Sequence, residues 1–198
     1  MSNANTSAIR LIVEGHSMSK KTMLIEHWRK NHPNFTTLSG EWRTPFGIPL
    51  MCSEGRPINL PAEQLHKAYD TVLNMLELFP QQQFVFNRFH ISQQFFDELF
   101  QTQYYDSSVE SRLGKMNTVI LYLRNSFDCY SDALNDRLQK YPQSLFPPTF
   151  EEYAAQERMF TDVLHKSNLP YIEYDVTKKP IEQISAEVFE ELQKIHVI

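Results

Sequence analysis

Residues 8–22 read AIRLIVEGHSMSKKT, an aliphatic run followed by a turn of small residues that ends in two lysines and a threonine. The apolar residues 8–13 predict a short, fully buried strand. Apolar side chains recur at helical spacing in the next segment, 22–32, and Pro33 ends that segment. The chain therefore opens with a strand, a glycine-containing turn and a helix, and this order decides the class of fold.

Strands and helices continue to alternate along the chain. Short β-branched or aromatic runs predict strands at 35–38, 83–87, 118–124 and 170–176. Amphipathic patterns predict helices at 61–79, 92–101 (with Ser92 as N-cap), 126–141, 149–166 and 180–195. This alternation predicts an α/β fold of three layers, a parallel sheet with helices on both faces. In such a sheet a ligand binds beyond the carboxyl ends of the strands.

Length and composition favour one compact domain over residues 1–198, with 1–8 as a disordered leader and no signal peptide. The formal net charge of −5 disfavours nucleic acid as a partner but leaves a local basic cleft open. The two cysteines have no metal-ligand spacing, and no apolar stretch is long enough to span a bilayer. These features predict a soluble cytoplasmic protein without a membrane partner.

The turn after the first strand matches most of the phosphate-binding pattern GxxxxGK[ST]. Lys20 replaces the second glycine of the pattern. The residues expected to contact nucleotide phosphates are Gly15, His16, Ser17, Met18, Ser19, Lys20, Lys21 and Thr22. In such a loop backbone N–H groups surround phosphate oxygens, the lysine neutralises charge and the threonine hydroxyl ligates Mg²⁺. The alternative is a serine-rich turn that caps a helix and carries two surface lysines.

Two further groups of polar residues follow predicted strands. Arg88 comes directly after the buried run 83–87, where an unpaired guanidinium is costly. It is interpreted as a phosphate clamp, the alternative being a salt bridge to a helix carboxylate. After the second strand, Glu41, Trp42 and Arg43 offer an acceptor substrate a carboxylate, a stacking surface and a guanidinium, or else form a solvated loop.

Three pieces, LIVEGHSMSKKT, FVFNRFHIS and VILYLRNSFDCYSDALNDRLQ, occur in an order that resembles the thymidylate kinase and deoxynucleoside kinase branch of P-loop kinases, especially short phage-type members. The resemblance extends over residues 9–195 and implies the P-loop kinase fold with ATP and Mg²⁺ as cofactors. It implies that Lys21 holds the donor phosphates, that Thr22 ligates Mg²⁺, and that Arg88 lies between donor and acceptor. Arg137, in the helix that ends in arginines in this family, would contact ATP.

The acceptor side is less defined by the resemblance. Glu41 would match the acid that accepts the 5′-hydroxyl proton in nucleoside kinases, and Arg43 the arginine that grips the monophosphate in thymidylate kinases. The pocket for the base is expected from the irregular stretch 39–62 and the helix 61–79. Tyr69 on that helix is a candidate substrate contact, although its place in the core explains it equally well.

The chain departs from the family at three places. Lys20 replaces a glycine, Asn87 replaces the acid beside the arginine, and the candidate lid, 140–149, has Lys140 but no arginine. Some thymidylate kinases carry the basic residue of the lid in the P-loop instead, and Lys20 is hypothesised to serve as such a catalytic cation. Replacing Lys20 by alanine should then lower turnover far more than nucleotide affinity.

These features together predict an ATP- and Mg²⁺-dependent kinase that phosphorylates a deoxynucleoside monophosphate, dTMP or a modified pyrimidine nucleotide. The alternatives are a deoxynucleoside kinase, a kinase for a hydroxymethylated pyrimidine as nucleotide or in DNA, and a non-catalytic nucleotide-binding protein of the same fold. A viral member would act in the host cytoplasm. The aromatic segment 93–105 is a candidate homodimer surface or part of the core.

Overall fold

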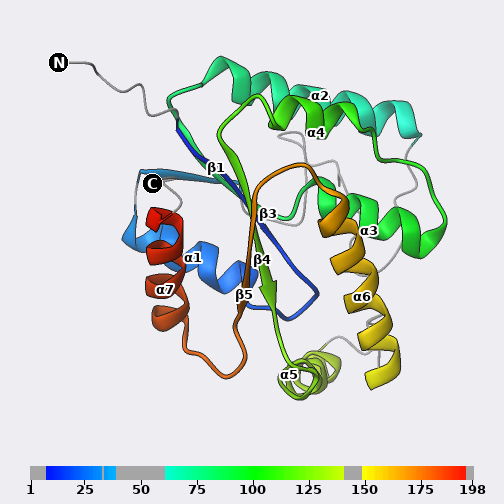
Figure 1. The fold of residues 1–198 in the computed structure, drawn as a ribbon. Coiled ribbons are helices and arrows are strands. Elements are labelled where there is room, and N and C mark those ends of the chain that lie inside the picture. The colour runs from blue at the N-terminus through cyan, green and yellow to red at the C-terminus, as the bar shows by residue number, and fades with distance from the viewer. Residues whose placement is uncertain (1–7, 33, 39–60, 141–148, 195–198) are drawn as a thin grey trace.

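The computed structural model of the chain describes residues 8–32, 34–38, 61–140 and 149–194 (Figure 1). Its strands are β1 (Arg10–Glu14), β2 (Phe35–Leu38), β3 (Gln83–Asn87), β4 (Thr118–Arg124) and β5 (Tyr171–Asp175). Its helices are α1 (Lys21–Asn31), α2 (Ala62–Leu78), α3 (His90–Phe100), α4 (Ser108–Leu113), α5 (Phe127–Lys140), α6 (Phe150–Lys166) and α7 (Ile181–Lys194). Strands and helices therefore alternate, with paired helices after β3 and after β4.

The strands form one parallel sheet in the order β2-β3-β1-β4-β5. β1 lies in the middle, where Ile12 aligns with Phe86 of β3 and with Ile120 of β4. The chain leaves β1 toward β2 on one side and later crosses to β4 on the other. The carboxyl end of β1 is therefore the topological switch point at which such sheets bind their ligands. The predicted parallel sheet is confirmed.

Alternate residues of the strands pack against helices on opposite faces of the sheet. Leu11 and Val13 point to the face that α1 and α7 cover. Ile12 and Phe86 point to the other face, where α2, α3, α4 and α6 pack (Figure 1). Strands that are buried on both faces must be apolar on both faces, which explains the unbroken aliphatic runs in the sequence. The three predicted layers are confirmed.

One charged side chain interrupts the apolar pattern of β1. Arg10 is 3% exposed. Its guanidinium donates hydrogen bonds of 3.2 Å to the carbonyl oxygens of Leu76, Phe79 and Pro80. The last carbonyl groups of a helix have no partner within the helix, so the buried arginine satisfies them at this end of α2. It thereby joins the start of the central strand to the end of α2.

Most predicted elements agree with the observed ones. The strands at 35–38, 83–87 and 118–124 have the predicted bounds. β1 begins two residues later than predicted and continues through Glu14. The predicted helix at 149–166 begins with a capping box, because the Thr149 side chain and Glu152 bond each other's backbone N–H groups.

Two predictions about helices need correction. Ser92 is not the N-cap of α3, because α3 begins at His90. The Ser92 hydroxyl instead donates to the carboxylate of Glu14 and accepts from Arg88 Nη1 at 2.9 Å, so these contacts engage the group that a local cap would use. The sequence pattern also misses α4, in which Val109 and Leu113 are the buried residues. Two apolar positions are too few to reveal a helical period.

Other predictions fall on different parts of the molecule. Residues 1–7 of the predicted leader 1–8, the acceptor residues Glu41, Trp42 and Arg43, and most of the lid, 141–148, lie outside the described residues, whereas Ala8 is buried. In the aromatic segment 93–105, Phe95 is in the core, and Phe96, Leu99, Tyr104 and Tyr105 are partly buried against it. The segment therefore packs largely inside the fold.

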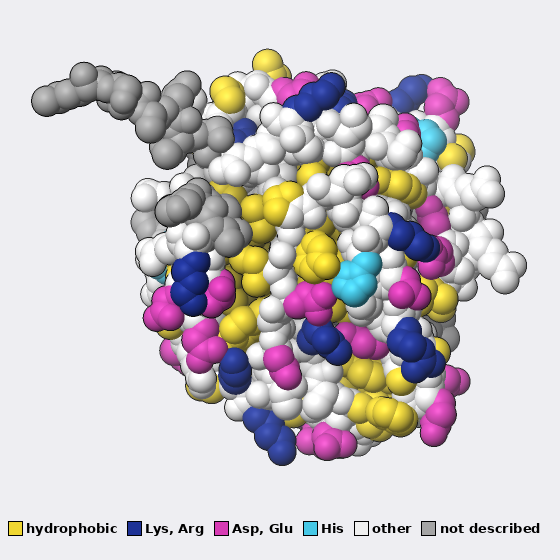
Figure 2. All heavy atoms as spheres, in the orientation of Figure 1, with side chains coloured by type: hydrophobic (Ala, Val, Ile, Leu, Met, Phe, Trp, Pro, Cys, Tyr) yellow, Lys and Arg dark blue, Asp and Glu magenta, His cyan; other side chains and the backbone are white. Residues whose placement is uncertain are grey.

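The described surface carries side chains of both charges. Figure 2 shows Lys, Arg, Asp and Glu side chains interspersed over the described part of one face. Among the helices in the described ranges, none is both long enough and apolar enough to cross a membrane.

Candidate active site

The loop between β1 and α1 passes close to β4. Gly15 has a φ of 140°, and a Cβ atom on it would lie 2.3 Å from the carbonyl oxygen of Leu123. Glycine is required here, because both the conformation and the contact exclude a side chain. Further along, the buried Ser19 hydroxyl donates to the carbonyl oxygen of His16 at 2.9 Å. These contacts fix the path by which the loop enters α1.

Lys21, the first residue of α1, holds a buried ammonium group at the N-terminus of the helix. It is 6% exposed. Its Nζ donates to the carbonyl oxygens of Gly15 and His16 and to Ser19 Oγ, at 2.9, 2.5 and 3.0 Å. Burial lowers the pKa of Lys21 well below its usual value, and repulsion by Arg88 acts in the same direction. A buried cation that is bonded to uncharged oxygens at a helix N-terminus fits a phosphate group.

Thr22 and Asn87 come from different elements and meet at the same edge of the sheet. The Asn87 Nδ2 group donates to Thr22 Oγ1 at 3.1 Å. Hydroxyl and amide oxygens are of the hard type that Mg²⁺ prefers, and this ion usually keeps several waters and substrate phosphate oxygens as ligands. Within the described residues no group of three or more His, Cys, Asp or Glu side chains could hold a metal. Thr22 and Asn87 could each offer an oxygen to a metal ion beside the P-loop.

Arg88 follows β3 in a left-handed backbone conformation, with a φ of 70°. Its Nη1 donates to Ser92 Oγ at 2.9 Å. The Ser92 hydroxyl in turn donates to the carboxylate of Glu14, which also accepts the N–H of Phe89 at 2.6 Å. A left-handed conformation is costly for a residue other than glycine and persists where its surroundings impose it. Here the Arg88 N–H donates to the Val13 carbonyl oxygen at 2.9 Å, and Glu14 holds the residues that follow, so that both contacts impose the conformation.

Glu14 is a buried residue of the candidate site that the sequence analysis missed. It is fully buried at the end of β1. Burial raises the pKa of Glu14, whereas the charge of Arg88 and the hydrogen bonds from Ser92 and Phe89 lower it. Burial lowers the pKa of Arg88, and attraction to Glu14 opposes that change. The signal in the sequence is a carboxylate that continues an aliphatic strand and directly precedes the loop glycine.

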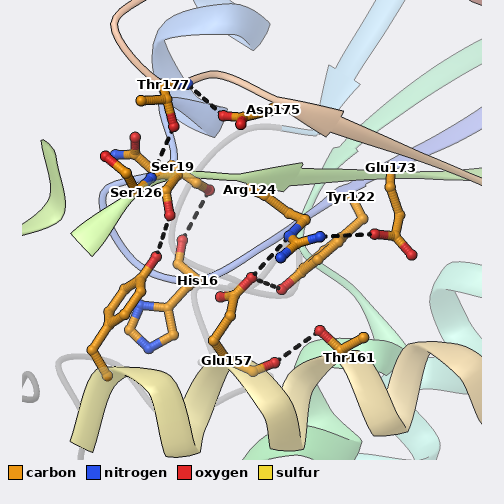
Figure 3. A network of polar contacts seen from close by, with 12 residues as sticks. His16, Ser19, Tyr122, Arg124, Ser126, Glu157, Thr161, Glu173, Asp175 and Thr177 are labelled. Atoms are coloured by element: carbon orange, nitrogen blue, oxygen red, sulfur yellow. Dashed lines mark hydrogen bonds and ion pairs between the residues drawn. The ribbon is translucent and has the colours of Figure 1, made fainter. Parts of the chain in front are cut away.

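A second carboxylate approaches the loop from α6. Glu157 accepts a hydrogen bond from the Tyr122 hydroxyl at 2.7 Å and lies 3.5 Å from Arg124 Nε (Figure 3). Burial raises the pKa of Glu157, which Tyr122, Arg124 and Lys21 counteract. Arg124 also pairs with Glu173 of β5 at 3.5 Å. This network joins α6 to the carboxyl end of β4 and to the middle of β5, and sequence spacing gave no signal for it.

His16 lies in the loop among aromatic side chains. The centroid of its ring is 4.8 Å from that of Tyr153 and 5.3 Å from that of Tyr130. Its Nε2 is 3.0 Å from Gln156 Oε1. Burial lowers the pKa of His16 to about 4, so the ring is neutral at physiological pH. The side chain therefore packs the loop against α5 and α6, and its backbone is the part that fits a phosphate.

Lys20 precedes α1 in a left-handed conformation, with a φ of 61°. Its Nζ donates to the carbonyl oxygens of Lys179 and Val176, at 2.6 and 3.3 Å, in the turn between β5 and α7. Arg88 lies at the other side of β1, after β3. A role for Lys20 at the transferring phosphoryl group would require these two hydrogen bonds to break.

Two other predicted site residues lie on helices. Tyr69 of α2 is 1% exposed and packs against Phe89, with 5.1 Å between ring centroids. Arg137 is a partly buried residue of α5. The structure thus brings together the P-loop residues, Thr22 and Arg88 at the carboxyl ends of the central strands. Tyr69 packs against Phe89, the residue that follows Arg88.

Comparison with known proteins identifies similar structures but no similar sequences. No protein-family model and no curated protein sequence match this chain. The structure of the YorR protein from Bacillus subtilis, in complex with phosphorylated GDP, has a TM-score of 0.62 and 12% identity, and covers 94% of this chain and 97% of its own. Thymidylate kinase from Candida albicans has a TM-score of 0.57 and 13% identity, and the match covers 96% of this chain and 93% of the kinase. Deoxyadenosine kinase from M. mycoides with bound dCTP has a TM-score of 0.55 and 14% identity, and the match covers 93% of this chain and 99% of the kinase.

The molecule therefore has the α/β fold of P-loop nucleotide kinases, in the thymidylate kinase and deoxynucleoside kinase-like form that the sequence resemblance implies. Sequence identities of 12–14% support a shared fold only. The substrate must therefore be inferred from the residues of the site.

Proposed function

We propose that the chain is an ATP- and Mg²⁺-dependent kinase that phosphorylates a deoxynucleoside monophosphate, dTMP or a modified pyrimidine nucleotide. The observation that carries this proposal is the pair of cations Lys21 and Arg88 at the carboxyl ends of the adjacent strands β1 and β3. Their hydrogen bonds to described residues go to uncharged oxygens. Phosphoryl transfer depends on positioning and charge neutralisation, which two such cations supply.

Each residue would have a distinct part in the reaction. Lys21 and the loop N–H groups would bind the donor phosphates, and Arg88 would bind oxygens between donor and acceptor. Thr22, with Asn87, would hold Mg²⁺, which when bound neutralises charge on the β- and γ-phosphates. An acceptor phosphate oxygen would form a bond to the γ-phosphorus as the bond to the β–γ bridging oxygen breaks. The products would be ADP and a nucleoside diphosphate.

The acceptor residues remain part of the proposal. Arg43 would bind the acceptor monophosphate, with Trp42 beside it, and Tyr69 would help to close the pocket from α2. If the acceptor were instead a nucleoside, Glu41 would take the proton of its 5′-hydroxyl. The names of two similar structures, thymidylate kinase and deoxyadenosine kinase, support a nucleotide or nucleoside as the partner.

One observation favours a second candidate, a nucleotide-binding protein without transfer activity. The Thr22 hydroxyl receives its hydrogen bond from the amide of Asn87, where the family has a carboxylate. An amide supplies no charge to a metal ion, so a weak magnesium site would leave binding without turnover.

The test is ADP release by the full chain with ATP, Mg²⁺ and a panel of nucleosides and nucleoside monophosphates. We expect turnover with one pyrimidine monophosphate. Lys21→Met should reduce it at least about 100-fold, because a preorganised cation at the developing charge contributes that much. Lys30→Met, an exposed lysine of the same helix, is the matched control and should be neutral. Turnover with nucleosides alone would identify a nucleoside kinase, and tight ATP binding with no turnover the non-catalytic protein.

A further inference from the structure

Lys20 has both an unusual backbone and an unusual side-chain position. The phosphate-binding pattern has glycine here, and the structure explains why, since the residue has φ 61° and ψ 10°. A left-handed conformation is nearly free for glycine but unfavourable for lysine. Lysine at this position therefore raises the free energy of the folded backbone relative to glycine. We look for the compensation in contacts that the lysine side chain makes and glycine could not.

The side chain of Lys20 is bonded to a neighbouring turn. Its Nζ donates to the carbonyl oxygens of Val176 and Lys179. The Lys179 N–H donates to the Val176 carbonyl at 3.2 Å, so the two oxygens belong to one hydrogen-bonded turn. This turn ends two residues before α7 begins at Ile181. A charged donor strengthens such hydrogen bonds relative to neutral ones.

Two more hydrogen bonds complete a closed set of contacts among three loops. The Asn125 Nδ2 group, just after β4, donates to the Met18 carbonyl of the P-loop at 3.3 Å. The Ser126 N–H donates to Thr177 Oγ1 in the β5–α7 turn at 2.9 Å (Figure 3). The loops after β1, β4 and β5 are thus joined pairwise, and Lys20 supplies the link between the first and the third.

The position of this set of loops relates it to one substrate. Arg88, proposed to lie between donor and acceptor, follows β3 on one side of the P-loop. In-line transfer puts the donor nucleoside on the other side of the transferred group. That other side is formed by the loops after β4 and β5, which lie beyond β1 in the strand order. The turn that Lys20 holds is therefore beside the donor nucleoside and away from the acceptor.

We propose that Lys20 is a positioning residue for the donor nucleotide. Its side chain fixes the P-loop to the β5–α7 turn, so that the surfaces that contact the donor phosphates and the donor nucleoside are preformed. The inference rests on the proposed function, because it assigns the donor side of that site. Without the link, only a fraction of molecules has loop and turn in register, and the apparent donor affinity falls by that fraction. Acceptor affinity is unaffected, because the acceptor contacts the β3 side.

The experiment compares three substitutions at Lys20 in the full chain. Lys20→Met keeps the left-handed conformation and the aliphatic stem but cannot donate, and the dissociation constant for ATP should rise about tenfold. Lys20→Arg retains the charge and the donors and should restore most of the affinity. Lys20→Gly removes the backbone cost but also the link, so it should be at least as stable as Lys20→Met and still bind ATP as weakly. Lys30→Met controls for loss of charge on α1.

The measurements separate the inference from the proposed function. ATP affinity, KM for each substrate, turnover and amide hydrogen exchange at residues 15–20 and 176–179 are compared. We expect raised KM for ATP, unchanged KM for the acceptor and faster exchange in both segments for Lys20→Met. Lowered turnover with unchanged ATP affinity would overturn the inference and assign Lys20 to the transferring phosphoryl group. Unchanged ATP affinity with lowered stability would leave only a structural role. A wild-type protein that binds no ATP would overturn the proposed function itself.

Discussion

The P-loop is held on its two sides by opposite charges in different surroundings. On the β3 side, the Glu14 carboxylate is fully buried and bonds the first turn of α3. On the β5 side, the partly exposed Lys20 ammonium bonds two carbonyl oxygens of a turn. A buried charge that loses its partners has no water to replace them, whereas an exposed one has. We therefore expect the contacts on the β3 side to contribute most to stability, and those on the β5 side to affect nucleotide binding more than stability.

Gly15→Ala should have the largest effect, because Gly15 anchors the loop for both sides. A Cβ atom 2.3 Å from the Leu123 carbonyl oxygen, at a φ of 140°, forces the backbone to move. We expect a loss of about 5 kcal/mol in the free energy of unfolding, measured in urea. Gly114→Ala is the matched control, since its Cβ would meet nothing closer than 3.4 Å, and it should change stability by less than about 1 kcal/mol. Equal effects would show that the close approach at Gly15 is not what fixes the loop.

Glu14→Ala tests the buried side. It leaves the Phe89 N–H and the Ser92 hydroxyl without their acceptor and Arg88 without a compensating charge. We expect a loss of about 3–4 kcal/mol in urea unfolding. Glu14→Gln keeps an acceptor oxygen and the side-chain shape, and should cost about 1 kcal/mol. A neutral Glu14→Ala would contradict the view that this carboxylate holds the Arg88 turn.

The pH dependence of stability tests whether the His16 side chain of the P-loop is buried. Burial depresses the folded pKa from 6.5 to about 4, so the neutral ring favours the folded state above pH 6.5. As the pH falls, the unfolded chain takes up the proton first, and this stabilisation is lost. The free energy of unfolding of the wild type, relative to His16→Gln, should therefore fall by about 2 kcal/mol between pH 7 and pH 5. A pH-independent difference would contradict burial of the ring.

Asn125→Ala should have the smallest effect and sharpens the contrast between the two sides. The Asn125 amide makes a single bond of 3.3 Å to the Met18 carbonyl at a partly buried site. We expect a loss of about 0.5 kcal/mol, because water can replace a weak neutral hydrogen bond. A cost as large as that of Glu14→Ala would mean that the β4 and β5 side secures the fold as well.

The sequence predicts the sheet better than it predicts the site. The runs 83–87 and 118–124 are bounded, largely apolar segments that are buried on both faces, and the edge strand 35–38 is marked by its aromatic and β-branched residues. The P-loop is also predicted, because its residues are adjacent in the chain. Glu14 and Glu157 were not, since their partners, Ser92 and Tyr122 respectively, come from other elements.

The same physical reason explains the wrong helix start at Ser92. Local preference makes serine a good N-cap, but its hydroxyl is already engaged by Glu14 and Arg88. Contacts between distant segments thus override a local signal, and they do so at the site, where polar groups from several strands converge. The hydrogen bonds of Lys20 could not be predicted for a related reason, because its carbonyl partners lie far along the chain at Val176 and Lys179.

The buried Arg10 has a consequence for a helix beside the site. It holds the end of α2 that is remote from the P-loop, whereas Tyr69 on the same helix touches Phe89 beside Arg88. Arg112 of α4 pairs with Asp70 and Glu77 of α2, at 3.1 and 2.9 Å. Helix α2 is thus fixed at several points along its length. The contact of Tyr69 with Phe89 therefore belongs to a rigidly packed surface behind Arg88.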